Sequence, residues 1–428
     1  MASARERLAL WAYATLLRLL TPLYLLRLWV RGRAEPLYRV ALGQRLGFYA
    51  DAPSSGCLWI HAVSLGETRA AAPLIAALRA AEPGLRMLLT HSTATGRAAA
   101  QELLADGDQL SWLPYDTPGA VGRFLRHFRP RIGVLMETEI WPGLMLGAAR
   151  TGVPMLLANA RLSERSERRG RRFSILLHAA AARLTAAFAQ TEQDAQRLRA
   201  SGVVEVQVCG NLKFDLQPDA PLLARGRAWR EALQRPVLLL AVSREGEEAL
   251  LLDAWRDLPA PPQALLLIVP RHPQRFDEVA GRVAQGGLSL KRRSQWAETP
   301  SPAALQAQVW LGDSMREMSL YYGLADVALL GGSFAPLGGQ NLIEAAACAC
   351  PVLMGPNTFN FAEASELAEQ AGAARRVADM ATALAEGLAL IADRPRQQQM
   401  AARAQAFAAQ HRGAAQRMAA RVLSYSKR

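Results

Sequence analysis

One segment sets the architecture of the chain: Leu329-Leu330-Gly331-Gly332-Ser333-Phe334-Ala335-Pro336-Leu337-Gly338-Gly339-Gln340-Asn341-Leu342-Ile343-Glu344-Ala345. It reads as the end of a buried strand, a glycine-rich turn, and a helix that begins near Asn341 with Glu344 in its first turn. Glycines let the backbone approach a ligand closely, and a helix N-terminus offers unpaired N–H groups and a positive dipole end to an anion. The pattern predicts a phosphate or nucleotide site, but two Gly-Gly pairs alone also fit a simple strand-to-helix turn.

Strands and helices alternate around this segment. Short, almost wholly apolar runs separated by amphipathic helices predict parallel sheets covered by helices on both faces. The alternation breaks near residues 217–221 and then restarts, which predicts an α/β protein with two doubly wound halves. The predicted strands are residues 57–63, 87–90, 110–113, 132–136, 154–158, 185–189 and 205–208 in the first half, and 237–242, 264–269, 308–311, 327–330 and 352–354 in the second.

Length and composition agree with two folded domains. A chain of 428 residues is long for a single core, and 51% hydrophobic against 20% charged residues excludes a disordered protein. The net charge of +13 favours anionic partners, which are nucleic acid, acidic lipid or phosphorylated substrates. The four cysteines form no C-x-x-C pair and the six histidines have no metal-ligand spacing. We therefore expect a reduced cytoplasmic protein without structural zinc.

The first 33 residues differ from the rest. Residues 8–30 are mostly apolar, but Arg18 and Arg27 interrupt the run and Pro22 breaks it, which argues against a charge-free spanning helix. We predict two short helices hinged at Pro22 that form an uncleaved hairpin or interfacial anchor. A pair of core helices and a single membrane span are the alternatives. The anchor would place aromatic side chains at headgroup depth and basic ones on the cytoplasmic side: Trp11, Tyr13, Tyr24 and Trp29, then Arg31 and Arg33.

Polar residues follow many of the predicted strands. In parallel sheets of this kind, ligands bind at the carboxyl ends of the strands. Carboxylates, amides and one lysine follow the strands of the first half, whereas arginines, serines and glycine turns follow those of the second half. This division suits the transfer of a group from a nucleotide donor to a hydroxyl, in which a base removes the hydroxyl proton and fixed charge stabilises the leaving phosphate.

Six ordered motifs then resemble a known family, the 3-deoxy-D-manno-octulosonic acid (Kdo) transferases of lipopolysaccharide synthesis. The similarity runs from the N-terminal anchor to the last helix. The motifs are His61-Ala-Val-Ser-Leu-Gly-Glu67, Met136-Glu-Thr-Glu-Ile-Trp-Pro142, Gly210-Asn-Leu-Lys-Phe-Asp215, Pro270-Arg-His-Pro273, Gly331-Gly-Ser-Phe334 to Glu344, and Gly355-Pro-Asn-Thr-Phe-Asn-Phe361.

The resemblance implies a GT-B fold, with two Rossmann-like domains facing a central cleft, and a metal-independent, inverting glycosyltransferase without a cofactor. The enzyme would move Kdo from CMP-Kdo to the lipid A precursor (lipid IVA) at the cytoplasmic face of the bacterial inner membrane, where anionic lipids attract its charge. The implied divisions are a membrane anchor at 1–33, an acceptor domain at 34–217, a CMP-Kdo domain at 222–395, and a C-terminal helix at 396–428 that packs back on the acceptor domain.

The resemblance also implies site residues. Glu67 is similar to the catalytic base, and Glu137 and Lys213 match positions that support the transition state. The implied CMP contacts are Pro270, Arg271, Met315, Arg316, Glu317, Asn341, Leu342, Ile343 and Glu344. We expect the helix dipole and solvent exposure to keep Glu67 ionised, and we expect Glu137 and Glu139 to share a face if their strand continues. Gln340 stands where family members usually have His, so no proton transfer is expected there.

The sequence leaves alternatives open for one basic stretch and for the function of the protein. The Arg-rich stretch 161–172 fits the phosphates of an acidic glycolipid or a solvated helix face equally well. A UDP-sugar transferase or epimerase would share the two halves and the glycine-rich donor site. A basic membrane-attached scaffold or nucleic-acid-binding protein would explain the charge. It would not explain the strand-end carboxylates, which repel phosphate backbones, and so we expect no nucleic-acid partner.

Overall fold

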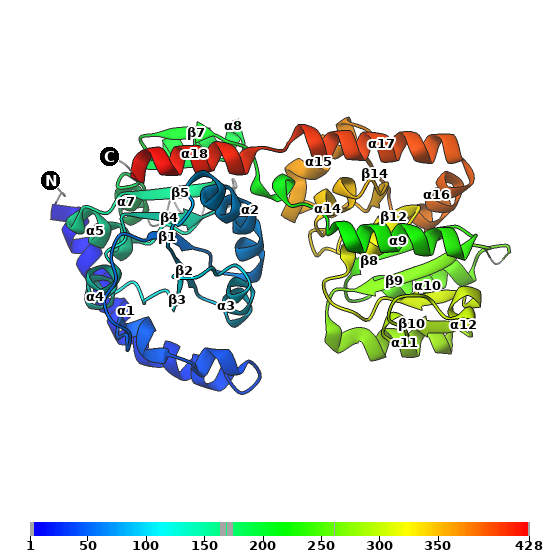
Figure 1. Ribbon diagram of the computed structural model, residues 1–428, viewed down its shortest axis with the longest axis horizontal. Coiled ribbons are helices and arrows are strands. Elements are labelled where there is room, and N and C mark those ends of the chain that lie inside the picture. The colour runs from blue at the N-terminus through cyan, green and yellow to red at the C-terminus, as the bar shows by residue number, and fades with distance from the viewer. Residues whose placement is uncertain (1–3, 163–167, 169–173, 261, 427–428) are drawn as a thin grey trace. The chain divides into compact units, whose positions relative to one another are not determined.

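The computed structural model describes residues 4–162, 168, 174–260 and 262–426. Most of the Arg-rich stretch 161–172, and with it the choice between phosphate binding and a solvated helix face, lies outside the described residues. The chain divides into two compact units (Figure 1). The first unit contains residues 1–216 and 412–428, and the second contains residues 217–411.

The first unit is built on a seven-stranded parallel sheet with the order β3-β2-β1-β4-β5-β6-β7. Its strands are β1 (Leu58–His61), β2 (Met87–His91), β3 (Gln109–Trp112), β4 (Ile132–Met136), β5 (Met155–Ala160), β6 (Ala186–Ala189) and β7 (Val206–Val208). Its helices are α2 (Leu65–Ala81), α3 (Ala94–Gln101), α4 (Pro118–Phe128), α5 (Pro142–Thr151), α7 (Ser174–Ala181), α8 (Glu192–Ala200) and α18 (Ala414–Ser426). Buried side chains of α2 and α18 pack on one face of the sheet, and those of α4 and α5 pack on the other.

The second unit contains another seven-stranded parallel sheet, with the order β10-β11-β9-β8-β12-β13-β14. Its strands are β8 (Val237–Ser243), β9 (Leu265–Pro270), β10 (Leu290–Arg292), β11 (Val309–Leu311), β12 (Val327–Leu330), β13 (Val352–Met354) and β14 (Ala374–Arg376). Its helices are α9 (Ala220–Leu233), α10 (Glu247–Arg256), α11 (Phe276–Gln285), α12 (Pro302–Gln306), α13 (Met318–Leu324), α14 (Leu342–Ala347), α15 (Ala362–Gln370), α16 (Met380–Ala392) and α17 (Arg394–Gln410). The prediction of two parallel, doubly wound halves is confirmed, whereas the edge strands β10 and β14 were not predicted.

The N-terminal segment is one helix, α1 (Ala4–Arg31), so the predicted hinge at Pro22 is wrong. The helix continues through Pro22, and the neighbouring Thr21 hydroxyl donates a hydrogen bond to the Leu17 carbonyl at 2.7 Å. By length and composition α1 could cross a membrane, and only 6% of its most apolar window is buried. Its exposed large side chains are Leu8, Trp11, Leu16, Leu19, Leu23, Tyr24, Leu26, Trp29 and Val30.

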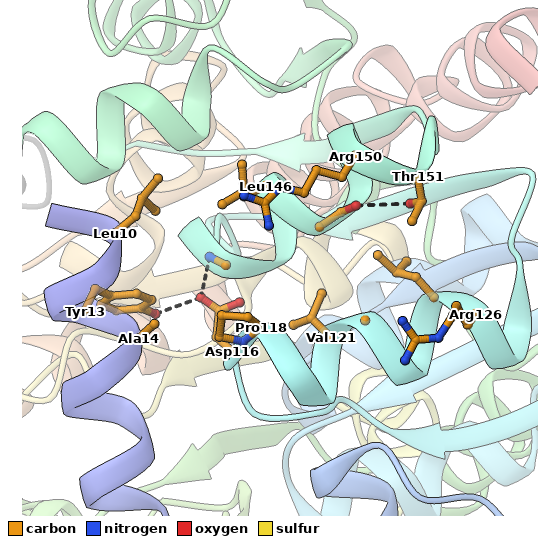
Figure 2. Close-up of a pocket in the computed structure, with 14 residues that line it drawn as sticks. Leu10, Tyr13, Ala14, Asp116, Pro118, Val121, Arg126, Leu146, Arg150 and Thr151 are labelled. Atoms are coloured by element: carbon orange, nitrogen blue, oxygen red, sulfur yellow. Dashed lines mark hydrogen bonds between the residues drawn. The ribbon is translucent and has the colours of Figure 1, made fainter. Parts of the chain in front are cut away.

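Helix α1 is tied to the first unit through Asp116. The Tyr13 hydroxyl donates to this carboxylate at 2.8 Å (Figure 2). The N–H groups of Gly143 and Leu144, at the start of α5, donate to it at 2.8 and 2.5 Å. Beside this contact, α1, α4 and α5 line a cavity of about 270 Å³. Asp116 therefore serves as a buried structural carboxylate that fixes α1 to the first unit.

The C-terminal segment is two helices rather than the single helix expected from residue 396. Helix α17 belongs to the second unit, and α18 packs on α2 in the first. Gly413, between the two helices, has a φ of 93°, which glycine adopts at little cost. The Asp215 carboxylate accepts hydrogen bonds from the N–H groups of Gly413 and Ala415 at 2.5 and 2.7 Å, and so caps the start of α18.

Candidate active site

Glu67 lies at the start of α2, directly after β1. The Ser64 side chain is the N-cap of α2 and accepts a hydrogen bond from the Glu67 N–H at 3.4 Å. The Glu67 carboxylate turns back and accepts the Val63 N–H at 2.6 Å. This reciprocal arrangement resembles a capping box and holds the carboxylate over the end of the sheet.

The surroundings of Glu67 differ from the sequence expectation of an exposed, ionised group. Burial raises its pKa to about 7, with smaller contributions from Glu139 and Glu137 that also raise it, while the Val63 N–H and Lys213 lower it. Desolvation and neighbouring carboxylates therefore outweigh the Val63 hydrogen bond and the Lys213 charge. A carboxylate with a pKa near 7 is well matched to proton abstraction at neutral pH.

Glu137 and Lys213 form an ion pair across two elements. Glu137 follows β4, and Lys213 lies in the 3₁₀ helix η4 (Leu212–Asp215). The ammonium nitrogen lies 3.5 Å from a carboxylate oxygen of Glu137, and both side chains are 22% exposed. Since β1 and β4 are neighbours at the point where the strand order reverses, Glu67 and Glu137 follow adjacent strands at the position where such sheets bind ligands.

Glu139 also belongs to this group, although it was not among the predicted catalytic residues. Strand β4 ends at Met136 and Glu137 has a φ of 57°, so Glu137 and Glu139 do not share a strand face as expected. The Trp141 indole N–H donates to the Glu139 carboxylate at 2.9 Å. Burial raises the pKa of Glu139. We call Glu67, Glu137, Glu139 and Lys213 the carboxylate–lysine cluster.

Asn159 supports this cluster from β5. It is fully buried with a φ of 52°, and its side-chain oxygen accepts the Leu212 N–H at 3.0 Å, at the first residue of η4. Its own carbonyl accepts the Gln190 side-chain N–H at 2.9 Å. Asn159 thereby fixes the 3₁₀ helix that carries Lys213. The only sequence signal for this role was its position directly after the predicted strand 154–158.

The histidine of the first motif is structural. His61 is fully buried, and burial lowers its pKa to about 3, so its ring is neutral at physiological pH. Its Nδ1 lies 3.0 Å from the Thr90 carbonyl and hydroxyl oxygens. His91 is buried beside it with a pKa lowered to about 4. Neither ring is suited to donate a proton in catalysis.

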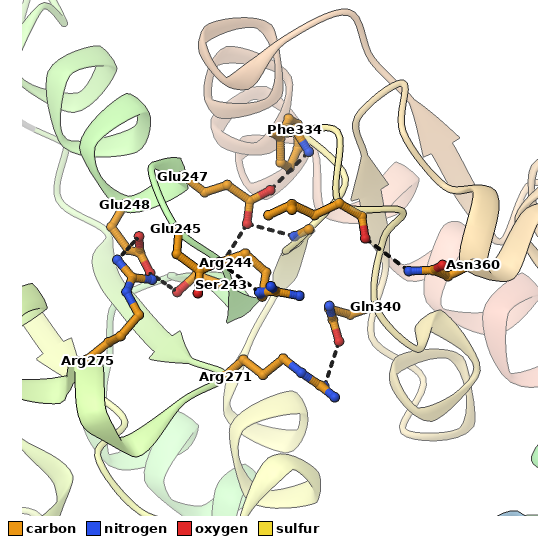
Figure 3. Close-up of polar contacts among 12 residues, drawn as sticks. Ser243, Arg244, Glu245, Glu247, Glu248, Arg271, Arg275, Phe334, Gln340 and Asn360 are labelled. Atoms are coloured by element: carbon orange, nitrogen blue, oxygen red, sulfur yellow. Dashed lines mark hydrogen bonds and ion pairs between the residues drawn. The ribbon is translucent and has the colours of Figure 1, made fainter. Parts of the chain in front are cut away.

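In the second unit, Glu247 organises the glycine-rich segment. Its carboxylate is completely buried and accepts the N–H groups of Arg244, Gly332 and Phe334 at 2.9, 2.7 and 3.0 Å (Figure 3). Glu247 thereby joins the turn after β8 to the turn after β12. These two strands are neighbours at the point where the strand order of this sheet reverses. Gly331 is required here, because a Cβ would lie 2.3 Å from the Val242 carbonyl oxygen.

Arg271 and Gln340 meet beside this turn. The guanidinium Nη1 of Arg271 donates to the Gln340 side-chain oxygen at 2.7 Å (Figure 3), and its main-chain N–H donates to the Ser243 carbonyl at 3.0 Å. Nearby, Arg275 binds the buried Glu248 through two hydrogen bonds of 2.7 and 3.0 Å. Arg271 thus lies at the end of β9 next to the glycine turns, where an anion would bind.

The other residues predicted to contact CMP differ in their burial and in their bonding partners. Asn341 caps α14 by accepting the Ile343 N–H at 3.1 Å. The Leu342 and Ile343 side chains are buried in the core, so these residues could contact a ligand only through the backbone. Glu317 forms an ion pair with the buried Arg293 at 2.7 Å, which gives it a structural role in this state. The remaining predicted residues are Pro270 at the end of β9, Met315 with 55% exposure, Arg316 with a φ of 68°, and the half-buried Glu344.

Within the described residues, no group of three or more His, Cys, Asp or Glu side chains is placed to bind a metal ion. The four cysteines, Cys57, Cys209, Cys348 and Cys350, are all buried and reduced. In the carboxylate–lysine cluster, the positive charge beside the carboxylates comes from Lys213.

The fold places the protein among GT-B-like enzymes. The crystal structure of HepE from Anabaena in complex with UDP is 14% identical, has a TM-score of 0.59, and covers 86% of this chain and 99% of its own. The UDP-GlcNAc 2-epimerase from Neisseria meningitidis bound to UDP-GlcNAc is 15% identical, with a TM-score of 0.57 and coverage of 86% and 99%. At these identities the likeness shows the fold alone, and it confirms the predicted GT-B architecture.

Sequence comparison then identifies the family. A family model described as 3-deoxy-D-manno-octulosonic-acid transferase (kdotransferase) matches residues 41–216. The 3-deoxy-D-manno-octulosonic acid transferase of Bordetella pertussis is 47% identical over 95% of this chain and 96% of its own. The Haemophilus influenzae enzyme of the same name is 33% identical over 97% and 98%. The chain belongs to the 3-deoxy-D-manno-octulosonic acid transferase family and is a glycosyltransferase.

Proposed function

We propose that this Kdo transferase moves Kdo from CMP-Kdo to a hydroxyl of the lipid A precursor lipid IVA, with inversion at the anomeric carbon and without a metal ion. The acceptor binds in the first unit and the donor in the second. The observation that carries this proposal is Glu67, a partly buried carboxylate of the carboxylate–lysine cluster with a pKa of about 7.

In the proposed step, the acceptor oxygen forms a bond to the anomeric carbon of Kdo as the bond from that carbon to the CMP phosphate breaks. The acceptor proton passes to Glu67, and CMP leaves with the bonding electrons. Direct displacement by one oxygen inverts the configuration. The base must be ionised to accept the proton, and the pKa of about 7 leaves a large fraction of Glu67 ionised at neutral pH.

Lys213 and Glu137 supply fixed charge for this step. Their ion pair, with N and O atoms 3.5 Å apart, holds the ammonium close to the base and lowers the pKa of Glu67. A preorganised ammonium stabilises negative charge on the donor carboxylate or leaving phosphate in a site of low dielectric. This supports a role for Lys213 that other transferases give to a divalent ion.

In the second unit, Arg271 is the residue best placed to bind the donor. Gln340 holds its guanidinium beside the glycine turns, and Glu247 holds the turns themselves. An arginine held in this way suits the phosphate of CMP or the carboxylate of Kdo, because guanidinium binds both groups bidentately. The amide of Gln340 positions the arginine and transfers no proton.

We further propose that the enzyme works at the cytoplasmic face of the inner membrane. The exposed apolar side chains of α1 and the net charge of +13 support binding to a bilayer that contains anionic lipids. Such a location would present a lipid-linked acceptor to the first unit.

The test is transfer of labelled Kdo, with CMP-Kdo generated in situ and lipid IVA as acceptor. Divalent metal is removed with a chelator after the donor has formed. We expect product from the wild type, about a thousandfold less from Glu67→Gln, and an inverted anomeric linkage by NMR. A well-folded wild type that makes no product, or that stops when the chelator is added, would overturn the acceptor or the metal-independent mechanism, respectively.

A further inference from the structure

In the first unit, the guanidinium groups of two arginines lie against the ring of one buried tryptophan. Trp112 ends β3, and the guanidinium carbons of Arg45 and Arg97 lie 4.0 and 4.9 Å from its ring centroid. The Tyr38 ring stacks on Trp112 with centroids 6.3 Å apart. Arg45 is only 4% exposed, whereas Arg97, in the first turns of α3, is half-buried. Two like charges are therefore held close together in a largely buried place.

Within the described part of the chain, neither arginine forms an ion pair with a carboxylate. One guanidinium nitrogen of Arg45 donates to the Ser92 carbonyl at 3.1 Å. The buried Nε of Arg45, the buried Nη1 of Arg97, and the hydroxyls of Tyr38 and Tyr115 have no hydrogen-bond partner among the described residues. Burying two cations and four unpartnered polar atoms together is costly unless an anion completes the site.

The electrostatics agree with a site that lacks its counter-charge. Burial lowers the pKa of Arg45 to about 10, and the nearby Arg97 lowers it further while Tyr115 and Tyr38 raise it. Burial also lowers the pKa of Arg97. Both arginines remain charged at neutral pH, so their mutual repulsion persists until an anion binds between them.

Main-chain hydrogen bonds through Val63 and Ser92 connect Arg45 to Glu67, the proposed catalytic base. The Val63 N–H donates to Glu67, and the Val63 carbonyl accepts the N–H groups of Ser92 and Thr93 at 3.2 and 3.1 Å. The Ser92 carbonyl in turn accepts the bond from Arg45. Glu67 follows β1, Ser92 follows β2 and Trp112 ends β3, so an anion on the arginines would lie at the same end of the sheet as Glu67.

We propose that Arg45, Arg97 and the Tyr115 hydroxyl bind a phosphate monoester of the glycolipid acceptor and so orient its hydroxyl toward Glu67. This inference rests on the proposed function, since it names the acceptor group that the first unit recognises. Arginine forks match phosphate oxygens bidentately, and Trp112 holds both guanidiniums in place from its ring. The Arg-rich stretch 161–172, considered for this role from the sequence, is not needed for it.

The test uses the full-length chain and two variants that remove the same charge. Arg97→Gln removes one side of the pair. Arg86→Gln is the matched control. Arg86 is exposed and directly precedes the N-terminal end of β2, away from the arginine pair. Its side chain donates only to the Ser55 carbonyl, at 3.2 Å, within the described chain. A further variant, Arg97→Lys, keeps the positive charge but loses the planar guanidinium that can bind a phosphate through two hydrogen bonds.

The probes are a short-chain acylated glucosamine disaccharide 1,4′-bisphosphate, its dephosphorylated form, and inorganic phosphate. Binding is measured by titration calorimetry in the Glu67→Gln background, which excludes turnover, and KM for each acceptor is measured in the Glu67 enzyme. We expect roughly tenfold weaker binding of the bisphosphate by Arg97→Gln, an intermediate loss for Arg97→Lys, and wild-type binding by Arg86→Gln. The dephosphorylated disaccharide should bind all four proteins equally weakly.

The outcomes separate this inference from the proposed function. Equal affinity of Arg97→Gln and Arg86→Gln for the bisphosphate would overturn the phosphate site even if Kdo transfer is observed. Phosphate-dependent binding that Arg97→Gln loses would support the site even if the wild type transfers no Kdo. Inorganic phosphate that binds as tightly as the disaccharide bisphosphate would overturn the assignment to the acceptor.

Discussion

The ammonium nitrogen of Lys213 lies 3.5 Å from a carboxylate oxygen of Glu137, and this ion pair links the end of β4 to η4. The pair also explains how Glu67 can act as a base in a cluster of three carboxylates. Glu137 and Glu139 raise the pKa of Glu67, and Lys213 opposes them. In the reaction proposed above, the cluster sets the pH dependence of the rate, and that dependence can be tested directly.

The rate should rise with pH through a limb centred near 7, because Glu67 must lose its proton and its pKa is raised to about 7. Lys213→Met removes the charge that lowers this pKa, so the limb should move to higher pH. Glu139→Gln removes a charge that raises it, so the limb should move to lower pH. We expect shifts on the order of one pH unit. The measurement is kcat/KM for the acceptor from pH 5 to 9.

The two variants control for each other, because both remove one charge from the same cluster and predict opposite shifts. A role in folding alone would scale the whole profile without moving its midpoint. Midpoints that coincide with the wild type in both variants would contradict the assignment of the limb to Glu67.

Glu67 should also lower the stability of the fold when it is ionised. Its pKa is about 7 in the folded state against 4.5 for the ordinary group, so stability is full below pH 4.5 and declines as pH rises through 7. Glu67→Gln cannot ionise and still accepts the Val63 N–H through its amide oxygen. We expect no gain in the free energy of unfolding at pH 4.5 and a gain on the order of 2 kcal/mol at pH 8, discounted for partial exposure.

Chemical denaturation at both pH values provides this measurement. Glu102→Gln is the control, because it removes the same charge from an exposed position on the same unit. A Glu67→Gln protein that is less stable than the wild type at pH 8 would mean that the carboxylate contributes more through its hydrogen bond than it costs through burial.

Much of the fold could be predicted because its strands are short apolar runs between helices. The strands missed were β10 (Leu290–Arg292) and β14 (Ala374–Arg376), which lie at sheet edges and carry Lys or Arg where an inner strand carries Leu or Val. The predicted hinge in α1 failed because Pro22 does not end a helix that the side chains of the first unit hold at Tyr13 and Glu6. Local sequence carries no information on those distant contacts.

The proximity of the three proposed catalytic residues was predictable, whereas their electrostatic environment was not. Strand-end position and motif resemblance gave Glu67, Glu137 and Lys213, and the structure brings these three together. The pKa of Glu67 depends on burial and on charges from β4 and η4, which no helix-dipole argument includes. Glu247 was missed because its partner Gly332 is 85 residues away along the chain.

Gln340 should control donor binding through Arg271. Gln340→Ala removes the oxygen that accepts the 2.7 Å hydrogen bond from the Arg271 guanidinium, so the arginine loses its fixed orientation. We expect KM for CMP-Kdo to rise by roughly fivefold, consistent with the loss of about 1 kcal/mol, and KM for the acceptor to stay unchanged. Gln340→Glu, which keeps an oxygen acceptor, should restore the orientation. An unchanged donor KM in Gln340→Ala would show that Arg271 is positioned by other contacts.

Glu247 should be essential to the shape of the donor loop. Its two carboxylate oxygens accept three main-chain N–H groups in a fully buried place, so Glu247→Gln must turn its amide N–H₂ toward at least one of these donors. We expect a loss of about 2 kcal/mol in the free energy of unfolding and roughly tenfold weaker binding of CMP by calorimetry. Glu245→Gln is the matched control, since that carboxylate is 54% exposed and forms its ion pair with the Arg244 side chain. If Glu247→Gln binds CMP and unfolds like the control, the glycine-rich turns hold their shape without the buried carboxylate.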